Sequence, residues 1–178
     1  MVYEKEVQQM KVRHMVLSAS FAALMSICAW LCLPVMGMTF TMQTFGLFLT
    51  LLILGGKWGS VSILIYLLLG AVGIPVFSGF QGGIGILFGA TGGYIWGFLT
   101  AALVYWLTQK LWNKPALSCI WGLAVCYITG TVWFATVYGN GAGIGSIVLT
   151  CVAPYILPDA VKLILALLIT RRIGKYKL

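Results

Sequence analysis

Acidic residues are almost absent from this sequence: three of its 178 residues are Asp or Glu, against eleven Lys or Arg. Charged residues make up 8% of the chain and hydrophobic residues 61%, whereas a soluble domain carries about 25% charged residues. We therefore expect an integral membrane protein. The length leaves no room for a soluble nucleotide-binding domain beside the apolar segments.

The apolar runs are continuous and do not alternate with a period of two, so we expect α-helical spans. At about 20 residues per span, the length allows six spans with short loops. We expect one integral membrane domain over 1–178 that is all-α. It would consist of a cytoplasmic segment 1–14, a six-helix bundle 15–170 and a cytoplasmic tail 171–178. The expected spans are about 15–33, 42–54, 60–72, 84–107, 115–137 and a last segment that ends at 170.

The basic residues predict how the protein lies in the membrane. Ten of the eleven Lys and Arg residues fall in alternate connections, counting the termini, and the intervening loops have none. By the positive-inside rule, both termini and the connections at Lys57 and Lys110–Lys114 face the cytoplasm. The outer loops, rich in glycine and aromatic residues, are then expected to fold over an outward-facing ligand pocket. Tight turns are the alternative.

The sequence lacks the clusters that enzymes and metal sites need. Its five cysteines lie in or beside apolar runs without metal-ligand spacing, so we expect small buried side chains. There is one histidine, no nucleophile with a nearby base and no pair of carboxylates. We predict neither an enzyme nor a cofactor or metal site.

One acid and one base, Asp159 and Lys162, lie inside the apolar body. A charge at the centre of a bilayer costs roughly 2.5–3.5 kcal/mol, and such residues are usually functional. Their spacing of three puts both on one face of a helix. Pro158 is expected to open that helix, which would place Asp159 near its N-terminus. A structural ion pair is one interpretation, but desolvation makes such a pair poor at stabilising, so a ligand site is favoured.

Polar and aromatic side chains in the outer loops are further candidates. In an extended stretch, Thr39, Thr41 and Gln43 would point the same way, and helix capping by Thr41 is the alternative. These side chains suit a small ligand with polar and apolar parts. The candidate ligand-binding residues are Asp159, Lys162, Thr39, Thr41, Gln43, Phe77, Gln81 and Tyr94.

Small residues repeat at intervals of four in two of the expected spans. Ala19 and Ala23 form such a face in the first span, which would let another helix approach closely, and packing within the bundle is the alternative. In the fourth span we expect the repeat to serve internal packing. Its residues are Gly89, Gly93 and Gly97.

Several segments resemble the BioY family, the biotin-specific S components of energy-coupling-factor (ECF) transporters. They are TFTMQTF at 39–45, LLILGGKWG at 51–59, LPDAVK at 157–162 and, most specifically, YLLLGAVGIPVFSGFQGGIGILFGATGGYIWGF at 66–98.

The resemblance implies a six-helix S component in the prokaryotic plasma membrane that binds biotin from outside with high affinity. It also implies a transmembrane coupling subunit and two cytoplasmic ATPase subunits as partners. Asp159 and Lys162 would belong to the biotin site, with help from 41–43 and Gln81, and Ala19 and Ala23 would face the coupling subunit. The alternative is a stand-alone proton-coupled secondary transporter with Asp159 as the proton carrier.

Overall fold

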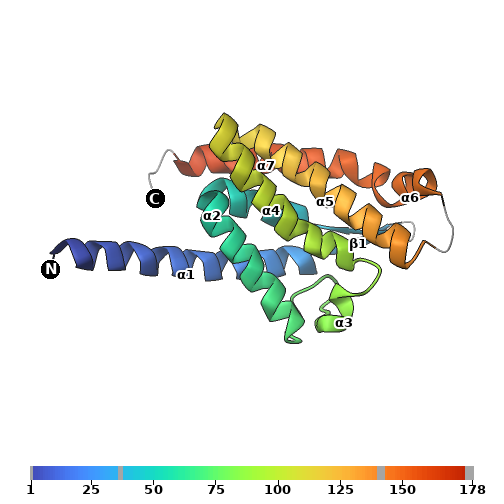
Figure 1. Cartoon of the computed structure of the whole chain (residues 1–178), viewed down its shortest axis with the longest axis horizontal. Helices are drawn as coiled ribbons and strands as arrows, with labels where there is room; N and C mark the ends of the chain where they lie inside the picture. Colours follow the sequence, from blue (N-terminus) through green and yellow to red (C-terminus); the bar gives the residue numbers. More distant parts are fainter. Residues whose placement is uncertain (1, 36–37, 140–142, 175–178) are drawn as a thin grey trace.

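The structure of the protein, a computed structural model, describes residues 2–35, 38–139 and 143–174. Figure 1 shows its helices and a two-stranded sheet, which are α1 (Val2–Trp30), β1 (Cys32–Val35), β2 (Met38–Thr41), α2 (Gln43–Ala71), α3 (Ile84–Leu87), α4 (Gly92–Trp112), α5 (Pro115–Val137), α6 (Ile144–Cys151) and α7 (Ala153–Gly174). Four segments are long and apolar enough to cross a membrane: Gln8–Trp30 within α1, α2, α5 and α7. The prediction of a helical protein with several spans is confirmed.

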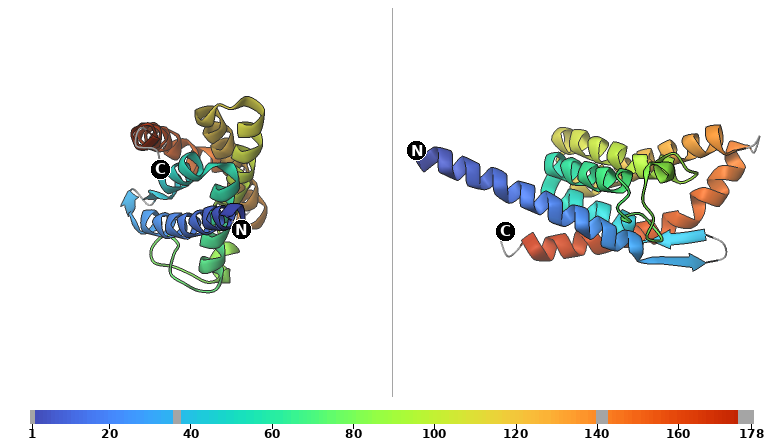
Figure 2. Two further views of the ribbon diagram at one scale, coloured as in Figure 1. Left: turned by 90° about the vertical axis from the view of Figure 1, so that its left-hand side faces the viewer. Right: turned by 90° about the horizontal axis from the view of Figure 1, so that it is seen from below.

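α1 is a single helix that includes both the expected polar segment 1–14 and the first span. Its N-terminal end projects beyond the other helices, as Figure 2 shows. The helix ends at Trp30, three residues before the predicted end of the span, because the chain continues as strand β1.

Strands β1 and β2 form an antiparallel hairpin in which Cys32 pairs with Thr41 and Leu33 with Phe40. The prediction of an all-α protein, with a loop at 34–41, is therefore wrong for this segment. Thr39, Phe40 and Thr41 are of types that favour strands. Pro34 is tolerated because a two-stranded sheet consists only of edge strands.

α2 contains the predicted second and third spans, joined at a sharp break. Gly55 has φ 73° and ψ 177° inside the helix, a conformation that glycine adopts without strain. The predicted inner turn 55–59 is reduced to this one residue, since the helix resumes at Gly56. A Cβ on Gly56 would lie 2.5 Å from Trp106 Cα, so the break is packed directly against α4.

The predicted fourth span, 84–107, is divided into two helices and ends later than expected. α3 stops at Leu87, and α4 begins at Gly92 and reaches Trp112. The chain turns so tightly between them that a Cβ on Gly92 would lie 2.0 Å from the Leu87 carbonyl oxygen. Asn113, in the left-handed conformation, ends α4.

The glycine repeat of α4 packs against α5, as predicted. A Cβ on Gly93 would lie 2.3 Å from Trp133 Cβ, and one on Gly97 would lie 2.8 Å from Cys126 Sγ. Trp133 Nε1 donates to the Gly89 carbonyl at 3.1 Å. All five cysteines are free, and the expectation of buried side chains is confirmed for those at 28, 119 and 126, whereas those at 32 and 151 are partly exposed.

The connection between α2 and α3 folds back over the end of α2. The Phe77 ring is 1% exposed and meets the Tyr66 ring edge-on, with centroids 5.5 Å apart. Gly70 makes room for it, because a Cβ there would come within 2.0 Å of Phe77 Cζ. Gly83 N–H donates to the Gly70 carbonyl at 2.7 Å and closes the loop. An aromatic side chain from the expected outer loop therefore fills the space beside α2.

Candidate functional site

Asp159 and Lys162 of α7 form a buried ion pair, with Lys162 Nζ 2.7 Å from Asp159 Oδ1. Asp159 is 2% exposed and Lys162 is 8% exposed. The expected placement on one helix face is confirmed, and the two charges contact each other directly. Burial of this kind requires that the remaining hydrogen-bonding capacity of both groups be satisfied.

The prediction that Asp159 lies at a helix N-terminus is wrong. α7 begins at Ala153, so Asp159 lies beyond its first turn, and Pro158 is inside the helix. Pro154 takes the early position where a missing N–H costs nothing. Pro158 has no N–H, so α7 lacks one backbone hydrogen bond at this position, and the helix continues past it. The carboxylate therefore depends on side-chain donors rather than on a helix N-terminus.

Three donors from three helices meet at the Asp159 carboxylate. Lys162 Nζ and the Thr44 hydroxyl of α2 both donate to Oδ1 at 2.7 Å. The Tyr127 hydroxyl of α5 donates to Oδ2 at 2.6 Å. Hydrogen bonds to an ionised acceptor are short and strong. The three donors fix the position of the carboxylate at the junction of α2, α5 and α7.

The Lys162 ammonium has three N–H donors, and the structure provides three acceptors. Besides Asp159, Nζ donates to the Thr41 carbonyl at 2.8 Å and to Thr44 Oγ1 at 3.1 Å. Thr44 therefore bridges the pair, accepting from the ammonium while donating to the carboxylate. The Thr41 carbonyl belongs to the last residue of β2, so the ammonium also attaches the hairpin to α7.

A chain of polar contacts extends from the pair toward the aromatic loop. The Thr41 hydroxyl donates to Gln43 Oε1 at 3.1 Å, and Gln43 Nε2 donates to the Tyr66 hydroxyl at 2.8 Å. Tyr66 in turn packs against Phe77. Met42 is the N-cap residue of helix α2, but the Gln43 N–H donates to the Thr41 hydroxyl at 3.4 Å, so Thr41 also partners the first N–H of the helix. The structure thus brings Thr41, Gln43 and Phe77 to the side of the site.

The other candidates have different neighbours among the described residues. Thr39 is exposed, and its carbonyl accepts from the Tyr155 hydroxyl at 3.3 Å. Gln81 is exposed, and its carbonyl accepts from Phe77 N–H at 2.9 Å. The Tyr94 hydroxyl lies 3.4 Å from Thr131 Oγ1 of α5. None of these three contacts involves Asp159 or Lys162.

The sequence interpretation missed three polar residues that complete the site: Thr44, Tyr66 and Tyr127. Thr44 could have been predicted from the sequence, because it directly follows the predicted polar segment and a buried carboxylate needs hydrogen-bond donors. Tyr127 is one of several polar side chains in a mostly apolar span, 32 residues from Asp159, and no local pattern indicates its partner. Tyr66 likewise occupies an ordinary apolar face of α2.

The face of α1 with the small residues is divided between two environments. Ser18 and Ala22 are fully buried, and the Ser62 hydroxyl of α2 donates to the Ser18 carbonyl at 2.8 Å. Ala19 and Ala23, one residue further along, are exposed. Packing within the described bundle thus uses Ser18 and Ala22, and the predicted partner-binding pair lies outside it.

The described residues contain no group of three or more His, Cys, Asp or Glu side chains able to hold a metal ion. The chemistry available is that of one carboxylate, one ammonium and several hydroxyls. Such a set can bind a solute through charge-assisted hydrogen bonds.

The fold and this site define a small multi-pass membrane protein with one buried, fully hydrogen-bonded charge pair. The protein is located in the prokaryotic cell membrane. The chain is a member of the BioY family, which matches residues 4–177.

Two relatives align with nearly the whole chain. The probable biotin transporter BioY of Pyrococcus horikoshii is 39% identical over 164 residues, covering 92% of this chain and 98% of its own. The biotin transporter BioY of Thermotoga maritima is 35% identical over 167 residues, covering 92% and 97%. Both relatives are named as transporters rather than enzymes.

A solved structure has the same fold. It is the crystal structure of the S-component for biotin from an ECF-type ABC transporter, with a TM-score of 0.83 and 23% sequence identity. The alignment covers 94% of this chain and 93% of that one. The helical arrangement is therefore that of an S component.

Proposed function

We propose that this protein binds biotin and takes it up as the substrate-specificity subunit of an ATP-driven ECF transporter. Membership of the BioY family and the names of the two relatives support biotin as the substrate. The observation that carries the proposal is the buried Asp159–Lys162 pair with its hydroxyl donors. A charged pair adds little to the stability of an apolar bundle, so its purpose is better sought in binding.

The chemistry of biotin fits this pair. Its ureido ring has two N–H donors and one carbonyl, beside an apolar thiophane ring and a carboxylate tail. The Asp159 carboxylate accepts from a ureido N–H, and the Lys162 ammonium donates to an oxygen of the ligand. An analogue without these groups cannot replace the hydrogen bonds that a ligand displaces on entering the site, which gives selectivity.

Biotin must replace hydrogen bonds that the site already has. All three N–H groups of Lys162 have acceptors, so a ligand oxygen displaces one of them. The Thr41 carbonyl is the exchangeable one, because it belongs to the short hairpin rather than to a helix. Gln43 and Phe77 then lie beside the ligand, and Thr39, Gln81 and Tyr94 surround it further out.

Six membrane crossings with both termini in the cytoplasm account for the helices. α2 contributes two crossings because of its break at Gly55, and α1, α4, α5 and α7 contribute one each. In this arrangement Lys57, Lys110 and Arg171 come to the same side, as the positive-inside rule requires.

The transporter is completed by a transmembrane coupling subunit and two cytoplasmic ATPases. Ala19 and Ala23 are the contact for the coupling subunit, because they are exposed and small enough for another helix to approach closely.

Calorimetry with biotin and the purified protein in detergent tests the proposal. Lys162→Ala should weaken binding by about 2 kcal/mol or more, because it removes charged hydrogen bonds in a buried site. Lys57→Ala is the matched control, since Lys57 is exposed and packs over the Trp58 ring. A well-folded wild-type protein that binds no biotin would exclude the proposed substrate.

A second measurement separates the transporter classes. Uptake that needs the coupling and ATPase subunits supports the ECF assignment. Uptake that proceeds without them and stops with a protonophore supports a proton-coupled transporter.

A further inference from the structure

A pocket lies near the far end of α7 from Asp159. Its volume is about 470 Å³, within the roughly 300–1,000 Å³ that small-molecule sites occupy. It lies between α2, the start of α5 and the end of α7. The lining residues are Leu52, Asn113, Lys114, Pro115, Ala116, Leu117, Leu167, Thr170 and Arg171.

The pocket combines apolar walls with two cations. Leu52, Leu117 and Leu167 come from three different helices, while Lys114 and Arg171 are exposed beside them. Outside its first six residues the sequence has a single acid, Asp159, and Lys162 binds it. Within residues 8–35, 38–139 and 143–174 no acid other than Asp159 is present to balance the two cations, so the pocket suits an anion with an apolar part.

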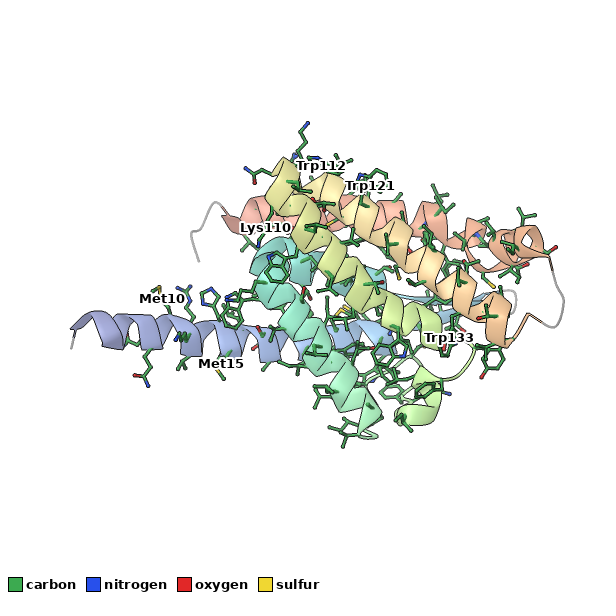
Figure 3. The ribbon with its side chains drawn as sticks, in the orientation of Figure 1. Met10, Met15, Lys110, Trp112, Trp121 and Trp133 are labelled. Atoms are coloured by element: carbon green, nitrogen blue, oxygen red, sulfur yellow. The ribbon has the colours of Figure 1, made fainter. Side chains whose placement is uncertain are left out.

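The surroundings of the pocket are those of a membrane–water boundary. Trp112 and Trp121, with ring centroids 6.3 Å apart, are about half exposed. Lys110 lies over the Trp106 ring at 4.7 Å. Figure 3 shows Lys110, Trp112 and Trp121 gathered at this end of α4 and α5. Tryptophan is enriched where headgroups meet the hydrocarbon core, so the pocket opens at the depth of the lipid headgroups.

We propose that this pocket binds one anionic phospholipid. Lys114 and Arg171 contact the phosphate, and the leucines contact the start of an acyl chain. Basic pockets between membrane helices are known to hold anionic headgroups. An acidic side chain of a partner protein would satisfy the cations but would not need apolar walls at headgroup depth. The proposal is independent of what the Asp159–Lys162 site binds.

Native mass spectrometry of the full chain in a neutral detergent provides the test. Dioleoylphosphatidylglycerol and dioleoylphosphatidylcholine are titrated separately, and bound lipids are counted for each protein. The pocket variant is Lys114→Gln with Arg171→Gln. The matched control is Lys110→Gln with Arg172→Gln, which removes one cation from each of the same two regions but outside the lining.

The expected result is one phosphatidylglycerol bound in preference to phosphatidylcholine. The pocket variant should weaken it on the order of 20-fold, from about fivefold for each cation near the headgroup, and the control about twofold or less. Equal weakening by both variants would show diffuse charge and overturn the proposal, as would unchanged lipid affinity in the pocket variant. Glycerol phosphate that competes fully at equal concentration would identify a site for soluble anions instead. Unchanged thermal unfolding confirms that both variants are folded.

Discussion

Tyr127→Phe removes one hydroxyl from the buried cluster and leaves the ring in place. That hydroxyl donates to Asp159 Oδ2 at 2.6 Å, while the other two donors both reach Oδ1. Oδ2 would therefore lose the donor that holds it. A hydrogen bond to a charged group contributes about 1.5–3 kcal/mol. We expect the substitution to remove about this much of the free energy that holds the carboxylate in its orientation.

The assay is calorimetry with biotin together with thermal unfolding. Biotin affinity should fall roughly tenfold, which corresponds to about 1.4 kcal/mol, and the unfolding midpoint should fall as well. Tyr138→Phe is the matched control, because its hydroxyl donates to the Phe88 carbonyl at 3.0 Å at an exposed position. This control should bind biotin like the wild type.

A double-mutant cycle shows whether the effect passes through the carboxylate. With Asp159→Asn already present, Tyr127→Phe should have little further effect, giving a coupling energy of about 1 kcal/mol or more. If Tyr127→Phe leaves biotin affinity and unfolding unchanged, or if its effect is the same in the Asp159→Asn background, the reasoning is refuted.

Three further substitutions test other parts of the structure. Thr44→Val removes the bridging hydroxyl and should weaken biotin binding by roughly tenfold or more, because donor and acceptor are lost together; calorimetry measures it. Gly70→Ala should lower the free energy of unfolding by about 1–3 kcal/mol, because the new methyl would overlap the Phe77 ring. Thermal unfolding measures the loss. Gly145→Ala is the control, because nothing lies within 4 Å of its new Cβ. Ala23→Trp should preserve biotin binding but abolish co-purification with the coupling subunit, because the bulky ring prevents close helix approach.

Each of these predictions has a contrary outcome. Unaltered biotin affinity in Thr44→Val would show that the bridge is not used for binding. Equal stability of the two alanine variants would show that the aromatic ring is not held against α2. Retained co-purification after Ala23→Trp would place the coupling subunit on another face.

The charged site could be predicted from the sequence because its signal is local. Asp159 and Lys162 stand out as lone charges in an apolar body, and their spacing fixes a shared helix face. The turn at Gly55 was indicated by two short apolar runs on either side of glycines. Glycines at intervals of four indicated packing inside the bundle, and the structure shows that α5 is the partner. Each of these patterns lies within a few residues of the feature that it specifies.

What the sequence did not indicate depends on contacts between distant segments. The hairpin pairs two four-residue strands, β1 and β2, which are too short for a clear alternating pattern. Pro158 is a strong signal for a helix start, yet the helix already begins at Ala153. Pro154 occupies the first turn, where proline is favoured, and Pro158 is accommodated inside the helix. Tyr127 and Thr44 reach Asp159 from other helices, and only the packing of α2, α5 and α7 brings them together.

The break at Gly55 divides α2 into two arms. The arm from Gln43 to Gly55 is about 18 Å long and the arm from Gly55 to Tyr66 about 16 Å, at 1.5 Å per residue. The hydrogen bond from Gln43 Nε2 to the Tyr66 hydroxyl, 2.8 Å long, ties the two arms together away from the break. The angle between the arms is also held by packing against other helices, where Gly56 meets Trp106 of α4 and the Ser62 hydroxyl donates to the Ser18 carbonyl of α1. The contact between Gln43 and Tyr66 therefore couples the arm that carries Thr44 to the arm that leads to the aromatic loop.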